Sequence, residues 1–418
     1  MRKTTKVTAS LIAMLLAACG GSGDSTTSAT QVSQTTTPAS TSTDTSGNGT
    51  TSTGSDTSAS PPASGPTADA GATPANTNDD QAARFTYPSH ITRDSAGNLY
   101  VQDRRDLNSP QNDVIRKIAT NGQVTTLPRL ANSGAIMDMT ACADNLFVLA
   151  ASTDTPESRP DGTSSTAGWT DIVKIAPDGT RTRFFSYRIF PGSYDPVTMS
   201  ADAQCRIYVD TRYRIIGAVD RIDRDRMRTG IISYLTWGSM FGVKSDAQGN
   251  LAIGYSDPSN GKYFIAYLPQ SAQPAPPRPK ATGAVSFPDA PGLVFREVGS
   301  GLGPMSFDAA GNLYILTTSV VEKVAPADAN PLGTYTLAAL TVRRMAPDGT
   351  LTTVFSGVPP GATSEFTASS PWYPSDLVAA PNGDVIITLP HDHTVYKIDG
   401  SGRATLVAGK NGEAGTSD

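Results

Sequence analysis

The chain has 418 residues, of which 38% are hydrophobic and 17% charged, and its formal net charge is −5. The mildly acidic balance leaves no basic excess to neutralise phosphates, so no nucleic-acid partner is predicted. Three Cys and three His exclude a Cys-rich stapled fold and most multi-His metal sites. No Phe, Tyr or Trp precedes Phe85, so a folded core is expected only beyond that residue.

Residues 1–18 have the pattern of a signal peptide, with a positively charged start and a short apolar run. The run is too short for a transmembrane helix, which needs about 20 apolar residues. It ends in Leu16-Ala17-Ala18-Cys19, which resembles the lipobox of bacterial lipoproteins. The resemblance implies a diacylglycerol on Cys19. The alternative is an ordinary secretory signal in which Cys19 is incidental.

Gly20, rather than Asp, follows Cys19. In the sorting scheme that the resemblance implies, Asp at this position retains a lipoprotein at the inner membrane. Gly20 therefore predicts an outer-membrane lipoprotein that is periplasmic or surface-exposed. The membrane is then one partner, contacted through acyl chains that anchor the protein firmly.

Residues 19–83 are predicted to be a disordered tether after the lipidated Cys19. From residue 20 onward they are rich in Ser, Thr, Gly, Ala, Pro and Asp, and Val32 is their one branched aliphatic residue. Such a chain buries too little apolar surface to offset the entropy cost of ordering. Residues 20–83 contain six Asp and no Lys or Arg, so much of the chain's acidity belongs to the tether.

Residues 84–418 repeat one short phrase six times. The clearest copies begin at Asp94 (DSAGNLYV) and Asp308 (DAAGNLYI), and looser copies begin at Asp246, Ala380, Cys142 and Asp202. Asp bonds its own backbone, Gly and Asn accept positive φ, and a β-branched or aromatic run follows, which together indicate a β-hairpin. A second hairpin phrase follows each copy, so each unit is predicted to hold about four short strands.

Six such units bury their apolar faces best when they stack radially in a ring. A single unit buries too little apolar surface, and a ring leaves only short strand edges exposed. We therefore predict an all-β, six-bladed β-propeller of four-stranded blades over residues 84–418; a β-solenoid is the rival. The units resemble NHL repeats, whose motif is matched by Pro88-Ser-His-Ile91, Gly97-Asn-Leu-Tyr-Val101 and Val124-Thr-Thr-Leu127. The stretch 406–418 reads as if it continued into 81–88. These segments are predicted to lie side by side and close the ring, in a protein expected to be a monomer.

Ligands of propellers usually bind at the mouth of the central channel, near the start of the innermost strands. Alignment of the units places His90, Asp138 and Asp376 there in three consecutive blades, and Thr198 in another. Such a group can hold a divalent cation, or use His as a base oriented by a carboxylate. The alternative is that these groups only face channel water.

Four residues at strand ends are further candidates for ligand binding at the mouth, with turn capping as the alternative: Asp103, Arg104, Asp210 and Arg212. His391 and His393 share one turn, where turn polarity is favoured over metal binding. Cys142 and Cys205 fall in the turns of neighbouring units, and an oxidising periplasm permits them to pair. Whether they are close enough is left open.

The sequence favours a binding module over an enzyme. Peptidyl-hydroxyglycine lyases of this propeller type use several His around zinc, and gluconolactonase-like propellers use an early Glu for calcium. The chain has three His and no Glu before Glu157, and it lacks G-x-S-x-G and H-E-x-x-H motifs. The predicted ligand is a protein, glycan or small molecule, and the protein partner would be an envelope protein. The alternative is a metal-assisted hydrolase or lyase at the channel mouth. No cofactor is predicted beyond a divalent cation in the channel. Long loops at 153–169, 269–293 and 359–372 are candidate contact surfaces.

Overall fold

The computed structural model describes most of the chain beyond residue 82. The described ranges are 83–130, 133–153, 168–189, 195–213, 216–235, 239–257, 261–274, 293–299, 301–323, 334–362, 365–367 and 376–418. The predictions for the signal peptide, Cys19 and the tether to residue 82 lie outside these residues. So do most of the candidate contact loops 153–169 and 269–293 and half of the loop 359–372. No helix within the described ranges is both long enough and apolar enough to cross a membrane.

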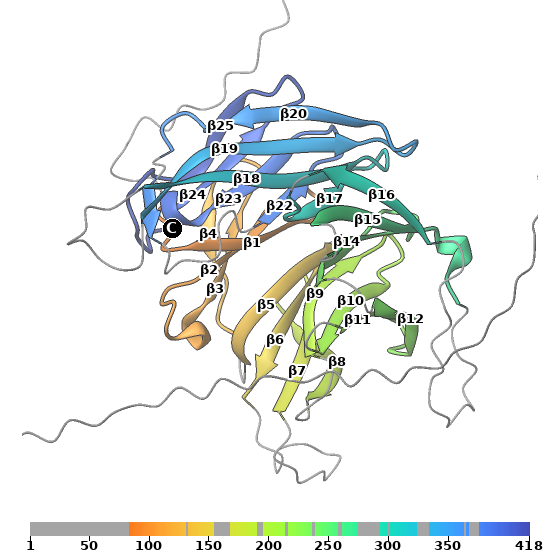
Figure 1. The fold of residues 1–418 in the computed structure, drawn as a ribbon. Helices are drawn as coiled ribbons and strands as arrows, with labels where there is room; N and C mark the ends of the chain where they lie inside the picture. The colour runs from red at the N-terminus through yellow and green to blue at the C-terminus, as the bar shows by residue number, and fades with distance from the viewer. Residues whose placement is uncertain are drawn as a thin grey trace, which may run out of the picture. The chain divides into compact units, whose positions relative to one another are not determined.

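The strands form six antiparallel sheets, each built from consecutive strands (Figure 1). Blade 1 contains β1 (Pro88–Arg93), β2 (Leu99–Asp103), β3 (Val114–Ile118) and β4 (Val124–Thr126). Blade 2 contains β5 (Ser133–Cys142), β6 (Asn145–Ser152), β7 (Gly168–Ile175) and β8 (Arg181–Ile189). Blade 3 contains β9 (Asp195–Ala201), β10 (Ile207–Tyr213), β11 (Ile216–Ile222) and β12 (Arg228–Leu235).

The other three blades repeat this order. Blade 4 contains β13 (Ser239–Ser245), β14 (Leu251–Asp257), β15 (Lys262–Leu268) and β16 (Val294–Gly299). Blade 5 contains β17 (Met305–Phe307), β18 (Leu313–Lys323), β19 (Thr334–Met345) and β20 (Leu351–Gly357), with β21 (Glu365–Thr367) added on β19. Blade 6 contains β22 (Asp376–Ala379), β23 (Val385–Leu389), β24 (Thr394–Ile398) and β25 (Ala404–Gly409). Short 3-10 turns are η2 (Pro110–Asn112), η4 (Gln270–Ala272) and η5 (Pro390–Asp392).

The blades close into a ring. The innermost strands contact one another in the order β1, β5, β9, β13, β17 and β22, and β22 contacts β1. In Figure 1 the blue strands of blade 6 accordingly lie beside the orange strands of blade 1. The prediction of a six-bladed β-propeller is confirmed.

The repeated phrase forms the turn between the first two strands of a blade. The Asp94 Oδ1 accepts the Asn98 backbone N–H at 2.8 Å, and its Oδ2 accepts the Asn98 side-chain amide at 2.8 Å. Gly97 has a φ of +94°, a conformation that L side chains rarely adopt. Asp308 bonds Asn312 in the same two ways. The local chemistry read from the sequence is therefore what shapes these hairpins.

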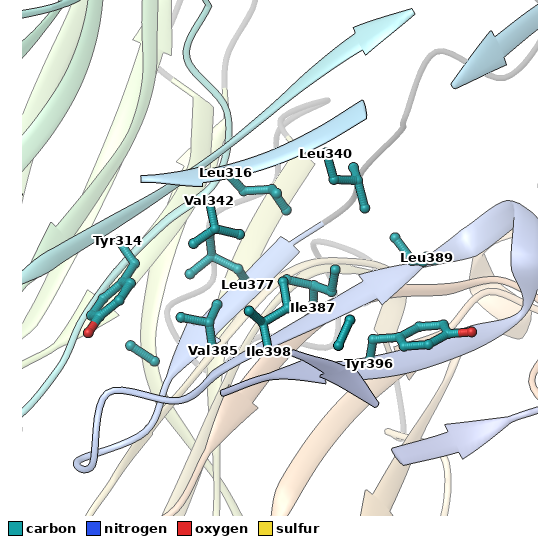
Figure 2. Close-up of a cluster of buried hydrophobic side chains, with 12 residues drawn as sticks. Tyr314, Leu316, Leu340, Val342, Leu377, Val385, Ile387, Leu389, Tyr396 and Ile398 are labelled. Carbon is teal, nitrogen blue, oxygen red and sulfur yellow. The ribbon is translucent and has the colours of Figure 1, made fainter. Parts of the chain in front are cut away.

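The hydrophobic core is distributed among the six blade interfaces. Figure 2 shows the cluster between blades 5 and 6, where Leu316 and Val342 pack against Leu377, Ile387 and Ile398. Comparable clusters fill the interfaces of the other neighbouring blades. Because each blade buries its faces only against its neighbours, the core depends on ring closure.

Backbone hydrogen bonds join the two ends of the propeller. The Arg84 N–H donates to the Ser417 carbonyl at 3.1 Å, and the Gly415 N–H donates to the Phe85 carbonyl at 3.0 Å. The predicted pairing of 81–88 with 406–418 is thus confirmed from residue 83 onward.

The Arg116 side chain lies fully buried at this junction. It donates to the carbonyls of Arg84 at 2.9 Å and Ser417 at 2.5 Å. Its guanidinium also pairs with Asp418 at 2.8 Å and with Asp103 at 3.5 Å. One side chain therefore connects blade 1 to both segments that close the ring.

A disulfide connects blades 2 and 3. Cys142 ends β5, Cys205 lies in the β9–β10 turn, and their Cα atoms are 5.4 Å apart. This separation is within the normal range for a disulfide. The structure thus brings the two neighbouring turns close enough for the pairing that the sequence left open.

Candidate functional site

Strand register gives each blade an equivalent position at one mouth of the channel. In each blade it directly precedes the innermost-strand residue that pairs with the third residue of the second strand, or the fourth in β6, as Ile91 pairs with Val101. The six equivalent residues are His90, Asp138, Thr198, Gly242, Pro304 and Asp376. The alignment made from sequence therefore placed the three candidates correctly along their strands.

Irregular pairing occurs at this mouth in four of the six innermost strands. The register shifts between Pro88 and Ile91 in β1, between Ile136 and Asp138 in β5, and between Met240 and Gly242 in β13. In β9 the shift leaves Val197 without a pairing partner on β10. Bulges of this kind redirect side chains and are common next to binding sites.

His90 lies between two carboxylates from the neighbouring blades. Its Nδ1 is 3.5 Å from Asp138 Oδ1 and 3.5 Å from Asp376 Oδ2. The side chains of Asp138 and Asp376 are 2% and 6% exposed, whereas that of His90 is 30% exposed. Ligand atoms of the three residues lie within 4.8 Å of one another, so this group is compatible with a bound cation.

Both carboxylates also accept backbone hydrogen bonds. Asp138 accepts the N–H of Met139 at 2.7 Å and, across the blade interface, that of Met199 at 2.7 Å. Asp376 accepts the N–H of Leu377 at 2.8 Å and, across the interface to blade 1, that of Ile91 at 3.2 Å. The two aspartates therefore link innermost strands to each other, a role that the sequence analysis did not predict.

A second ring of side chains lies two residues deeper in the channel. It is formed by Thr92, Thr140, Ser200, Lys244, Ser306 and Val378. Thr92 and Ser306 each accept a backbone N–H from the next blade, from Ala141 and Ala379, both at 3.1 Å. Lys244 is not among the residues predicted from the sequence, although the repeat that contains Asn250 places it two residues beyond the mouth position.

The charges of this group stabilise one another. Burial lowers the pKa of His90, but the hydrogen bond to Asp376 and the charges of Asp138 and Asp376 raise it above the usual value. Lys244 behaves alike, because the two aspartates overcome burial and raise its pKa. Burial raises the pKa of Asp376, but Lys244 and His90 outweigh it and lower that pKa. Lys244 and, when protonated, His90 therefore face the carboxylates of Asp138 and Asp376.

The mouth opens into a cavity of about 510 Å³. Its charged lining consists of His90, Arg104, Asp138, Arg212, Lys244 and Asp376, and its apolar lining of Ile136, Met137, Val197, Pro304 and Met305. Cavities of this size, with apolar walls and a few convergent polar groups, are typical small-molecule sites.

The strand-end candidates separate into two pairs. Arg104 and Arg212 line the cavity, whereas Asp103 and Asp210 do not and are 0% exposed. Asp103 accepts the backbone N–H groups of Thr86 and Tyr87, and Asp210 accepts two N–H groups of Arg212. Asp103 thus fixes the backbone before β1, and Asp210 fixes the Arg212 side chain. Both carboxylates lie behind the cavity wall and do not face a ligand directly.

His391 and His393 are placed beside the ring junction. His391 Nε2 lies 3.3 Å from the Tyr87 hydroxyl, and burial lowers the pKa of His391 to about 4. His393 Nδ1 lies 2.6 Å from the Thr86 carbonyl. Within the described ranges, the group at His90 is the one set of His, Cys and acidic residues arranged to hold a metal ion.

A second cavity, of about 300 Å³, opens at the other mouth of the channel among the innermost hairpin turns. Asp94, Asp246 and Asp308 line it, and each bonds the Asn four residues further along its own turn. These carboxylates are therefore occupied within their hairpins.

Comparison with known proteins yields solved structures of low identity. A virginiamycin B lyase from Staphylococcus aureus is 12% identical, with a TM-score of 0.39 over 77% of this chain and 84% of that one. A putative gluconolactonase is 11% identical, with a TM-score of 0.42 over 79% and 92% of the two chains. Hydrazine synthase of Kuenenia stuttgartiensis is 14% identical, with a TM-score of 0.45 over 75% and 77%. At these scores the likenesses carry no argument about function.

No protein-family model and no curated protein matches the sequence. The resemblance to NHL repeats therefore stays a prediction.

Proposed function

We propose that this chain is a cell-envelope lipoprotein whose NHL-type propeller is a binding module for a small molecule held at the channel mouth. The observation that carries the proposal is the cavity of about 510 Å³, into which blades 1, 2, 3, 4 and 6 contribute charged side chains. Its volume and mixed lining suit a compact polar ligand better than an extended protein surface or a long glycan.

Strand direction supports binding at this mouth. β1 begins at the mouth and β2 ends there, because antiparallel strands alternate. The connections from second to third strands, and from each blade to the next, therefore leave from the same end as His90. Binding residues concentrate in such connections, whereas the opposite mouth carries the tight hairpin turns.

A ligand screen with a cavity-filling variant tests the proposal. We expect members of a library of small polar molecules to bind the purified protein by saturation-transfer NMR, and Val197→Phe to weaken that binding at least about tenfold. Leu406→Phe introduces the same phenyl ring at a side chain that is 45% exposed on β25, and serves as the control. Ligands that bind Val197→Phe as well as the native protein contradict the proposal.

The envelope location rests on the motif that ends in Cys19 and requires its own test. We expect globomycin to block processing, and Cys19→Ser to release the protein from the membrane fraction. A Cys19→Ser protein that still fractionates with outer membranes contradicts the lipid anchor.

A metal-assisted hydrolase or lyase is the second candidate, favoured by the closeness of His90, Asp138 and Asp376. His90 Nδ1 and one oxygen of each aspartate would be the ligands. The fit is incomplete, because each carboxylate already accepts two backbone N–H groups and Lys244 adds a positive charge.

Metal analysis of the purified protein distinguishes the two candidates. Stoichiometric metal that is lost in both His90→Ala and Asp376→Ala supports the enzyme. A native protein that remains metal-free after incubation with Ca²⁺, Mg²⁺ or Zn²⁺ contradicts it.

A further inference from the structure

We infer that the ligand of the channel-mouth cavity is a small organic anion that carries a hydroxyl group, bound by Arg104 and Lys244. The inference rests on the proposed function and assigns the ligand's chemical class.

The bases at the mouth are accessible and the acids are not. The side chains of Arg104, Arg212 and His90 are 22%, 30% and 30% exposed. Each is paired with a carboxylate that is at most 6% exposed, whether Asp113, Asp210, Asp138 or Asp376. A ligand entering the cavity therefore meets basic groups first.

The carboxylates at the mouth can also accept few hydrogen bonds from a ligand. Asp138 and Asp376 each accept two backbone N–H groups and face His90, so their oxygens have little left to offer a ligand. This arrangement disfavours a cationic ligand, because such a ligand would have to compete with both His90 and Lys244 for the same oxygens.

Two of the cations retain unused donors. Lys244 is attracted to Asp138 and Asp376, but among the described residues its ammonium forms no hydrogen bond to a protein acceptor. Arg104 has its nearest carboxylate, Asp113 Oδ2, 3.9 Å from Nε, too far for a hydrogen bond, and that Nε has no partner. Arg212, by contrast, is held by two hydrogen bonds to Asp210. Among the described residues, Arg104 and Lys244 are therefore the cavity cations whose side chains are not hydrogen-bonded to a carboxylate.

Gln102 adds a requirement for a donor on the ligand. Its Nε2 donates to Asp113 Oδ2 at 2.6 Å and to the Ile136 carbonyl at 3.1 Å, which fixes the orientation of the amide. Its Oε1 is buried without a hydrogen-bond partner, and Gln102 lines the cavity. A ligand hydroxyl would satisfy this acceptor.

The remainder of the wall favours an organic ligand over an inorganic ion. Ile136, Met137, Val197, Pro304 and Met305 contribute apolar surface. A volume of about 510 Å³ greatly exceeds that of phosphate or sulfate. A carboxylate attached to a small hydroxylated carbon frame matches both the cations and the apolar contacts.

Calorimetric titration with matched pairs tests the inference. Each pair contains a hydroxy acid and the alcohol in which CH₂OH replaces the carboxylate: galacturonate and galactose, glycerate and glycerol, 4-hydroxybenzoate and 4-hydroxybenzyl alcohol. We expect the acid of at least one pair to bind at least about tenfold more tightly than its alcohol, and added salt to reduce the difference.

Variants assign the effect to the two cations. Lys244→Met and Arg104→Met should each weaken the acid about tenfold or more without affecting the alcohol, whereas Lys244→Arg should retain the preference. Lys397→Met, at a side chain 44% exposed on β24, is the matched control.

Three outcomes overturn the inference. If an alcohol binds as tightly as its acid, the site does not require a negative charge on the ligand, and the proposed binding function still holds. If the affinity for the acid is unchanged in Lys244→Met and Arg104→Met, the acid binds at another site. If no acid binds at 10 mM, a level chosen as about ten times a weak millimolar Kd, the ligand is not a small organic anion. The proposed function is then judged by the Val197→Phe screen alone.

Discussion

Replacing Arg116 by Met removes the side chain that connects the two ends of the ring. The native guanidinium is fully buried and interacts with the carbonyls of Arg84 and Ser417 and the carboxylates of Asp103 and Asp418. Met has a similar alkyl length but no guanidinium, so the charge, all of its donors and the stacking of the Arg116 Cζ over the Phe85 ring are lost.

The expected loss is dominated by the groups left without a partner. Asp103 is 0% exposed and keeps only the backbone N–H groups of Thr86 and Tyr87. Removing one member of a buried ion pair typically costs about 3–5 kcal/mol, because the other charge remains buried. We expect Arg116→Met to lower the free energy of unfolding by about this amount.

The pH dependence identifies the cause. In the native protein burial raises the pKa of Asp103, although the N–H bonds of Tyr87 and Thr86 and the charge of Arg116 lower it. Without Arg116 that pKa rises further. A carboxyl with a raised pKa in the folded state favours folding below its unfolded pKa, and this contribution is lost as the pH rises through the folded pKa. The variant should therefore lose more stability at about pH 8 than at about pH 5, relative to the native protein.

Urea unfolding followed by circular dichroism measures these differences. The double variant Arg116→Met/Asp103→Asn should recover part of the loss at high pH, because no buried charge is then stranded. A loss below about 1 kcal/mol at pH 8, or an equal loss at both pH values, would refute the reasoning, since exposed ion pairs have effects of that size.

Further predictions concern the disulfide, the mouth and the hairpins. Replacing Cys142 and Cys205 by Ser should lower the free energy of unfolding by about 4 kcal/mol in the chain-entropy model, and an unchanged urea midpoint contradicts this. Asp376→Asn should lower the pKa of His90, because a hydrogen bond and a negative charge are lost while burial remains; an unmoved imidazole NMR titration counts against it. His90→Gln should lose more stability at about pH 5.5 than at about pH 8, because the raised pKa of His90 stabilises the fold below 6.5 and this contribution disappears as the pH rises through that pKa; the reverse order in urea unfolding argues against it. Asp308→Ala should cost about 1–3 kcal/mol through lost turn hydrogen bonds, and a smaller loss of thermal stability would show that the turn forms without them.

Much of the candidate site was predictable because the blades repeat. Once the units were aligned, His90, Asp138 and Asp376 had to occupy equivalent positions, and three neighbouring blades had to bring them together. The same alignment could have found Lys244. It lies two residues deeper than the mouth position, where the other blades carry Thr, Ser or Val. The alignment could not show that Asp103 and Asp210 would be buried behind the wall, because their burial depends on contacts with distant segments.

The sequence by itself determined the hairpins, the number of blades and the closure of the ring. Asp, Gly and Asn at fixed spacing act within a few residues, so their effect is readable without a structure, as the Asp94–Asn98 bonds show. Only the tertiary structure decided which polar groups remain open to a ligand. Ile91 and Asp376 are 285 residues apart, and their hydrogen bond exists only after six blades have closed. The same closure occupies the carboxylates and leaves Arg104 and Lys244 facing the cavity, because burial and partner choice are properties of the assembled ring.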